Sequence, residues 1–255
     1  MTLQFAQPDS HLRLERCFNF RDIGAYPGLD GRTVRWRRLF RSMTPEFASP
    51  SDLTTLKSLG IRTVIDLRGP RFKTSGPIGE PPVRRVAVGR RRALVPNPRA
   101  LAEFRSLPPE EALPLVLDRM AGSFAQVAGL VAESDGPVLF HCRLGKDRTG
   151  IMSALLLKLL GVDDSLVLED YLNSDGSLDQ TRSLLIESGE SPDEFDRQAH
   201  VVRAPAQKAV MEAVLRRLEE HYGGAYAYFR AHGVLKRQLD AIIVNNLETP
   251  PATPK

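Results

Sequence analysis

Hydrophobic and polar residues recur along this chain with two different periods, which predict strands and helices. Short apolar, β-branched or alternating runs predict extended segments at 14–20, 34–40, 63–67, 83–88 and 137–140. Apolar positions three and four residues apart predict helices at 51–59, 115–133, 149–160, 164–174, 178–187, 207–222, 225–231 and 235–245. The segment 99–114 is expected to be irregular or short-helical, and 70–82 a loop. Strands interleaved with helices indicate an α/β fold with a central, largely parallel sheet flanked by helices.

Turn-forming residues and prolines mark the expected boundaries. Ser49 or Ser51 can cap the helix at 51–59, which Gly60 can end. The candidate motifs are spread from residue 19 to residue 229 and must meet around one site, so we expect one domain over 14–247 with a flexible N-terminus at 1–13. The end of the chain, 248–255, holds three prolines in eight residues and is expected to be a disordered tail.

The segment 141–150 reads His-Cys-Arg-Leu-Gly-Lys-Asp-Arg-Thr-Gly and joins the strand at 137–140 to the helix at 149–160. A tight loop at a helix N-terminus forms an anion cradle, because unpaired N–H groups and the helix dipole converge there. Cys142, at the mouth of the cradle, is expected to be a thiolate near neutral pH. Arg148 offers a fork for two phosphate oxygens. This combination indicates a cysteine-dependent phosphatase.

This segment allows two other interpretations. A strand, a cysteine, a loop and a helix also occur in sulfur transfer of the rhodanese kind. The run Lys-Asp-Arg-Thr at 146–149 argues against it, because it supplies cationic donors suited to phosphate. In the second, Cys142 is a buried thiol that ends a strand and Arg148 caps a helix. The phosphate-loop character of the flanking residues would then be a coincidence.

Composition limits the possible partners. The net charge of +4 over 255 residues suits anionic substrates and does not indicate nucleic-acid binding. Five histidines and two cysteines show no ligand spacing, so we expect no metal and no other cofactor. There is no apolar run long enough for a transmembrane segment and no visible signal sequence. We therefore expect a cytoplasmic protein, which leaves export by a route without a signal open.

One basic cluster allows two interpretations: a solvated loop, or a docking surface for a multiply phosphorylated ligand or an acidic membrane. Its members are Arg84, Arg85, Arg90, Arg91 and Arg92. Cys17 is expected to be an ordinary buried thiol, with a role as resolving partner for an oxidised Cys142 as the alternative. The residues do not indicate an oligomeric state.

The segment 141–150 resembles the signature of the protein tyrosine phosphatase superfamily. Its Gly-Lys-Asp-Arg-Thr-Gly form is similar to the atypical bacterial tyrosine/lipid phosphatases, of which the mycobacterial protein tyrosine phosphatase B is typical. Further segments resemble that family at 19–24, 38–42, 59–68, 171–174, 222–224 and 228–229. The resemblance covers roughly 17–245 and is poor between about 70 and 117. It implies a cysteine-phosphatase fold with C-terminal helices and a helical lid between 166 and 187, for which a static packed pair of helices is the alternative.

The resemblance and the chemistry together assign roles around the loop. Cys142 is the expected nucleophile, Arg148 holds two equatorial phosphoryl oxygens and Thr149 hydrogen-bonds the thiolate. Lys146 adds a positive charge, and His141 fixes the loop. The backbone amides expected to bind phosphate belong to Arg143, Leu144, Gly145, Lys146, Asp147 and Arg148.

The general acid has three candidates. The resemblance implies Asp147, inside the loop. Asp66 ends a predicted strand, where open α/β sheets place ligands, and Asp22 is the third candidate, unless it is a buried partner of an arginine. Arg68 either orients the loop, touches substrate or forms a structural salt bridge.

The expected function is phosphomonoester hydrolysis through a phosphocysteine, acting on phosphotyrosine and also on phosphoserine, phosphothreonine or phosphoinositides. Hydrolysis of a small phosphorylated metabolite is the alternative within this class. A phosphate-binding module without catalytic activity is the alternative from another class, and the presence of Cys142, Asp147 and Arg148 argues against it.

Overall fold

The computed structural model describes residues 12–69, 83–88, 98–189 and 206–249. Its main sheet has five strands in the order β1-β3-β6-β4-β5. The pair β1 and β3 is antiparallel, and the other neighbours are parallel, as predicted for the fold class. The strands are β1 (Arg21–Asp22), β3 (Leu39–Ser42), β4 (Thr63–Asp66), β5 (Arg84–Ala87) and β6 (Val138–His141).

The register of the three inner strands determines where the site lies. His141, the last residue of β6, is paired with Ser42 at the end of β3 and with Asp66 at the end of β4. Because the three strands are parallel and end level, the segments that follow them leave from one edge of the sheet. Ligands of open α/β folds bind at this carboxyl edge.

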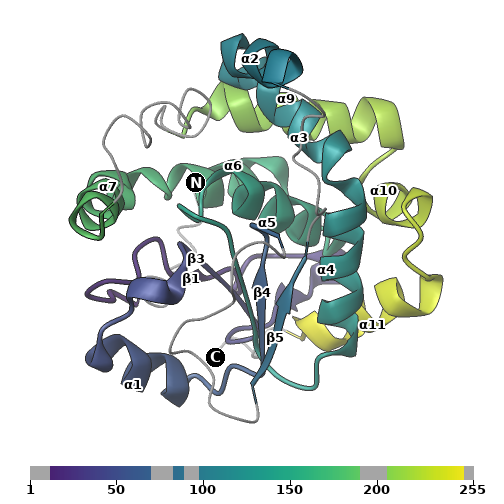
Figure 1. Cartoon of the computed structure of the whole chain (residues 1–255). Helices are drawn as coiled ribbons and strands as arrows, with labels where there is room; N and C mark the ends of the chain where they lie inside the picture. The colour runs from purple at the N-terminus through teal and green to yellow at the C-terminus, as the bar shows by residue number, and fades with distance from the viewer. Residues whose placement is uncertain (1–11, 70–82, 89–97, 190–205, 250–255) are drawn as a thin grey trace, which may run out of the picture.

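Helices cover both faces of the sheet (Figure 1). On one face, Phe40, Val64 and Leu139 pack against α1. On the other face, Ile65 and Phe140 belong to the larger core, formed with α3 to α5 and the C-terminal helices. The helices are α1 (Pro50–Ser58), α2 (Pro98–Ser106), α3 (Pro109–Arg119), α4 (Ala121–Glu133), α5 (Asp147–Leu159), α6 (Asp164–Leu172), α7 (Leu178–Glu187), α9 (Lys208–Tyr222), α10 (Ala225–Ala231) and α11 (Lys236–Asn246).

The start and end of α1 confirm the local signals in the sequence. Ser49 is the N-cap, and its hydroxyl accepts from the Asp52 backbone N–H at 3.1 Å. The Asp52 carboxylate accepts in return from the Ser49 N–H at 3.1 Å, which completes a capping box. Gly60 follows the helix with a φ of +66°, a conformation that glycine adopts without strain.

The single helix predicted at 115–133 was wrong. The structure has α3 and α4 there, bent by 62° at Met120, whose φ of −99° and ψ of 8° are not helical. Pro109 begins α3 at a position that needs no N–H donor, so the helix starts earlier than predicted. The bend lets α3 pack on α9 while α4 packs on α11.

Among the described residues, no single helix is long and apolar enough to cross a membrane. Only the bent pair of α3 and α4, taken together, has the length and composition of a membrane span.

Two of the predicted strands were also wrong: the one at 14–20 does not form, and the one at 34–40 is interrupted. The segment 14–20 contains bends and a turn that ends at Asn19, whose φ is +56°. The predicted strand at 34–40 is divided at Arg37, with a φ of +59°, into the end of β2 (Thr33–Val34) and the start of β3. Left-handed backbone at these two residues interrupts the extended conformation that the side-chain pattern favours.

The second sheet consists of β2 and β7 (Leu247–Glu248), paired antiparallel. Glu248, which we expected to begin the tail, therefore lies in a strand opposite Thr33. The remaining residues predicted to form the flexible N-terminus and the tail, apart from 12–13 and 249, lie outside the described residues.

Candidate active site

The loop after β6 runs from Cys142 to Lys146 and leads directly into α5. Cys142 is buried at 3% exposure, and the backbone of Lys146 forms the N-cap of the helix. In the described part of the chain, no side chain caps the first turn of α5. Its N–H groups are therefore available to an anion, and the helix dipole favours negative charge at the same point.

Three carbonyl groups of this loop accept hydrogen bonds from the scaffold, and that of Lys146 accepts the first hydrogen bond within α5. Because C=O and N–H of one peptide plane point in opposite directions, these bonds turn the following amides toward the other side. The four bonds run from Thr44 N to Arg143 O at 3.0 Å, from Asn19 Nδ2 to Leu144 O at 3.0 Å, from Arg41 Nη2 to Gly145 O at 2.7 Å and from Gly150 N to Lys146 O at 2.6 Å.

Gly145 is required at its position for two reasons. Its φ is +71°, a conformation that residues with a side chain rarely adopt. A Cβ on this residue would also lie 2.5 Å from the carbonyl carbon and oxygen of Ser42. The loop therefore packs directly on the backbone at the end of β3.

Arg148 and Thr149 lie in the first turn of α5, six and seven residues after Cys142. Arg148 is half-buried, and its Nη1 donates to the Leu67 carbonyl at 3.2 Å, which connects the helix to the end of β4. The Thr149 hydroxyl is fully buried and has no hydrogen-bond partner within the described residues. It is therefore free to donate to Cys142 or to a bound ligand.

His141 contacts the first residue of the loop, Cys142. Its Nδ1 lies 3.1 Å from the carbonyl oxygen of Cys142 and 4.0 Å from Asp66. Burial lowers the pKa of His141, partly opposed by the charge of Asp66, so the neutral ring donates to the Cys142 carbonyl. This geometry fits the expected role of His141 in fixing the loop and gives it no contact with a leaving group.

Asp66 and Arg68 form a buried network with Glu46, a residue the sequence reasoning missed. Arg68 donates to Asp66 at 2.8 Å and to both oxygens of Glu46 at 2.7 and 3.0 Å. The Arg68 backbone N–H also donates to Asp66 at 2.8 Å. Burial opposes the charge of Arg68, but hydrogen bonds to the two carboxylates raise its pKa above the usual value. The Asp66 carboxylate therefore accepts hydrogen bonds from both the side chain and the backbone of Arg68.

Asp147 is the candidate acid that lies in the loop–helix junction itself. Its side chain is almost fully buried, and its Oδ1 has no hydrogen-bond partner in the part of the chain that the structure describes. The nearest cation is the buried Nζ of Lys146, at 3.5 Å from Oδ1. Burial raises the pKa of Asp147, opposed by the charges of Lys146 and Arg148. A raised pKa favours the protonated form that a general acid needs.

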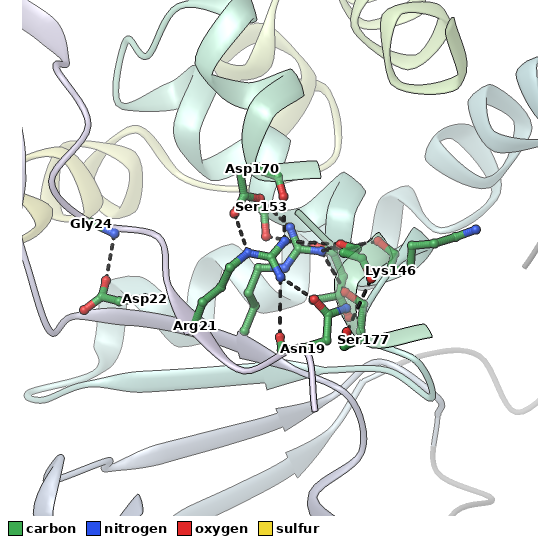
Figure 2. Close-up of polar contacts among 12 residues, drawn as sticks. Asn19, Arg21, Asp22, Gly24, Lys146, Ser153, Asp170 and Ser177 are labelled. Carbon is green, nitrogen blue, oxygen red and sulfur yellow. Dashed lines mark hydrogen bonds and ion pairs between the residues drawn. The ribbon is translucent and has the colours of Figure 1, made fainter. Parts of the chain in front are cut away.

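Asp22 points away from the loop. Its carboxylate accepts from the backbone N–H of Gly24 at 2.7 Å and of Arg37 at 2.5 Å. Burial raises the pKa of Asp22 to about 7, against these two hydrogen bonds. Figure 2 shows Asp22 and Gly24 apart from the residues around Lys146. The structure therefore gives Asp22 a structural environment, in which its hydrogen-bond partners among the described residues are backbone amides and not the side chain of Arg21 or Arg41.

The main feature that the sequence reasoning missed is Asp170, on α6. Its carboxylate accepts from Nε of Arg21 at 2.8 Å on one oxygen (Figure 2). The other oxygen accepts from Nη1 of Arg41. All three residues are at most 2% exposed. Two arginines in strand-forming segments were the available signal, because a buried guanidinium requires an anion. The sequence could not show which carboxylate supplies it.

The other predicted groups lie apart from this site or outside the described residues. Cys17 is fully buried, and burial raises its pKa to about 12, as expected for an inert thiol. Arg84 and Arg85 belong to β5, whereas the rest of the basic cluster, 90–92, lies outside the described residues. No group of three or more histidine, cysteine or carboxylate side chains suited to a metal ion occurs among the described residues.

Comparison with known proteins identifies the family. A family model described as "Tyrosine phosphatase family" matches residues 12–248. The chain is 34% identical over 179 residues to a Cupriavidus necator protein assigned as a tyrosine-protein phosphatase, covering 64% of this chain and 62% of that protein. It is 28% identical over 268 residues to the triple specificity protein phosphatase PtpB of Mycobacterium tuberculosis, covering 87% of this chain and 93% of that protein.

A tyrosine-protein phosphatase of Nostoc commune is 34% identical over 122 residues, which is 45% of this chain and 40% of that protein. The chain thus spans less than two thirds of the Cupriavidus and Nostoc relatives. Because the family model matches almost all described residues, the chain belongs to the tyrosine phosphatase family.

Proposed function

We propose that this protein is a cysteine-dependent phosphomonoester hydrolase that acts on phosphotyrosine, with phosphoserine, phosphothreonine or phosphoinositides as further substrates. The observation that carries the proposal is the geometry of the loop. Cys142 begins the loop that leads into α5, and the carbonyls of Arg143, Leu144 and Gly145 in that loop accept hydrogen bonds from other parts of the protein. Such an arrangement binds a phosphoryl group and places a nucleophile next to phosphorus.

In the first step, Cys142 Sγ attacks phosphorus as the bond from phosphorus to the leaving oxygen breaks. This forms a phosphocysteine and releases the alcohol or phenol. Arg148 and the loop amides hold the equatorial oxygens, where charge is spread in the transition state. In the second step, water attacks phosphorus, the P–S bond breaks, and orthophosphate leaves with the thiolate restored.

We assign proton transfer to Asp147. It gives its proton to the leaving oxygen in the first step and takes one from water in the second. Its burial and raised pKa support this role. Asp66 is bound by Arg68 through both the side chain and the backbone, and Asp22 faces backbone amides elsewhere. The geometry therefore favours Asp147 among the three candidates.

Phosphorylated proteins are the first substrates to test, because the three relatives carry the names of protein phosphatases. We further propose that 14–247 act as one domain, since the family model spans 12–248 without interruption. Two free cysteines support action in a reducing compartment such as the cytoplasm.

Phosphate release from a panel of substrates tests the proposal. The panel contains phosphotyrosine, phosphoserine and phosphothreonine peptides, phosphoinositides in vesicles, and phosphorylated sugars and nucleosides, ranked by kcat/KM. Highest kcat/KM on phosphotyrosine peptides is the expected result, with Cys142→Ser as the blank. A metabolite phosphate that exceeds every peptide and lipid would reassign the substrate class. No release from any member would leave only a phosphate-binding module.

A further inference from the structure

Arg41 occupies an unusual position between an anion and two carbonyl oxygens. It comes from β3, is fully buried, and bonds Asp170 through Nη1. Its Nη2 lies 2.7 Å from the carbonyl oxygen of Gly145 and 3.4 Å from that of Lys146. One guanidinium thus connects helix α6 to consecutive peptides of the phosphate loop. A planar fork with five donors suits this bridge, which a lysine ammonium would not reproduce.

We propose that Arg41 is a positioning residue, which holds the carbonyls of Gly145 and Lys146 outward and so directs the amides of Lys146 and Asp147 at the bound phosphoryl group. This inference rests on the proposed function of the same loop. This role does not follow from the assignment of Cys142 as nucleophile or of Asp147 as acid, because Arg41 does not touch the reacting atoms. It acts through the peptide planes, whose C=O and N–H point in opposite directions.

Asn19 contributes the second contact of the same kind. Its Nδ2 donates to Leu144 O at 3.0 Å, and its Oδ1 accepts from Arg21 Nη1. The Asn19 backbone has a φ of +56°, a conformation that asparagine adopts more easily than most residues. Arg21 thereby orients Asn19 but makes no hydrogen bond of its own to the loop.

The charges of this cluster have a second consequence. Arg21 and Arg41 share one carboxylate, Asp170, so the three side chains carry a net charge of +1 behind the loop. Burial and the neighbouring Arg21 lower the pKa of Arg41 to about 10, which keeps it charged at neutral pH. A test must therefore separate the position of the Arg41 guanidinium from its charge.

The two arginines allow that separation. Arg41→Lys keeps the charge but loses the fork that reaches Asp170 and the loop together. Arg21→Lys is the matched control, because Arg21 is equally buried, pairs with the same Asp170 and lacks a direct bond to the loop. Orthophosphate is the probe, its Kd measured by titration calorimetry at a temperature well below the Tm of each variant.

Arg41→Lys is expected to weaken orthophosphate binding by about 100-fold, because a small displacement of the donors removes most of their contribution. Arg21→Lys is expected to lose only a few-fold, even where its Tm falls as far. Amide exchange at Lys146 and Asp147 should accelerate in Arg41→Lys only. If Arg41→Lys does not fold, Asn19→Gly is the variant to measure. It keeps the positive φ and removes the hydrogen bond to the Leu144 carbonyl. Orthophosphate binding is expected to weaken in this variant too.

Two results would overturn the proposal: orthophosphate affinity in Arg41→Lys or Asn19→Gly equal to that of the unaltered protein, or an equal loss in both lysine variants. The second result would mean that the cluster only maintains the fold. Failure of the proposed function is a separate outcome. It appears as absence of turnover in the unaltered protein, whereas the affinity comparison needs no turnover.

Discussion

The carboxylate of Asp66 is held by the guanidinium of Arg68 at 2.8 Å, and both side chains are almost completely buried. Removal of Arg68 would leave a charged carboxylate without its partner in the protein interior. We predict that Arg68→Ala lowers the free energy of unfolding by about 3–5 kcal/mol. Chemical denaturation monitored by circular dichroism measures this change.

Arg84→Ala is the control for this prediction. Arg84 also lies next to a carboxylate, Glu133 at 3.4 Å, but both side chains are more than half exposed. Its loss should therefore cost less than about 1 kcal/mol. An equal loss of unfolding free energy in the two variants would show that burial does not strengthen the contribution of the Arg68–Asp66 pair to stability.

The assignment of Asp147 as the acid predicts a dependence on the leaving group. Asp147→Asn should slow the hydrolysis of alkyl and inositol phosphates by about 100-fold or more, because these oxygens leave poorly without a proton. Aryl phosphates with an acidic phenol need little protonation and should be affected much less. The measurement is kcat/KM across a series of leaving groups. A loss of the same size on every substrate would remove Asp147 from this role.

Asp66→Asn belongs in the same series as the comparison variant. Asp66 accepts hydrogen bonds from Arg68, so its replacement should reduce stability and affect all leaving groups alike. A loss confined to poor leaving groups in this variant would transfer the acid role to Asp66.

The raised pKa of Asp147 also has a consequence for the pH profile. A general acid must be protonated, so the rate on alkyl phosphates should fall as the pH rises through the pKa of Asp147. Because burial raises that pKa, the fall should occur at higher pH than for an ordinary carboxyl group. Asp147→Asn should lack this limb of the kcat profile. Its persistence in Asp147→Asn would assign the titration to another group.

Chelation and vanadate test the absence of a metal from the proposed chemistry. The thiolate, Arg148 and the loop amides supply the nucleophile and the charge stabilisation, so activity should be unchanged in EDTA. Vanadate resembles the transferring phosphoryl group and should compete with substrate. Loss of turnover in EDTA that a divalent ion restores would contradict this mechanism.

The parts of the fold that follow local rules could be predicted from the sequence. The helix at 51–59 has a capping serine and a terminal glycine, and the segment 141–150 has the charge and glycine pattern of a phosphate loop. The bend at Met120 could not be predicted, because the apolar pattern of α3 continues through it and only packing on α9 and α11 separates the two helices.

The same limit applies to the site. Residues next to Cys142 in the sequence were identified, since the loop is continuous from 141 to 149. Asp170 and Glu46 were not, because each meets its arginine through the tertiary fold. Asp22 shows the opposite case. Its neighbour Arg21 faces the loop side, whereas successive strand side chains point to opposite faces, which directs Asp22 away.

Cys142 carries the phosphoryl group during turnover in the proposed mechanism, and acid quenching can trap this phosphocysteine. The enzyme is mixed with a phosphotyrosine peptide, quenched within the first turnovers, and digested for mass spectrometry. We predict one phosphoryl group on the peptide that contains Cys142, and neither label nor turnover in Cys142→Ser, which should still bind orthophosphate. Turnover by Cys142→Ser at the rate of the unaltered protein, or a label on a different residue, would exclude Cys142 as the nucleophile.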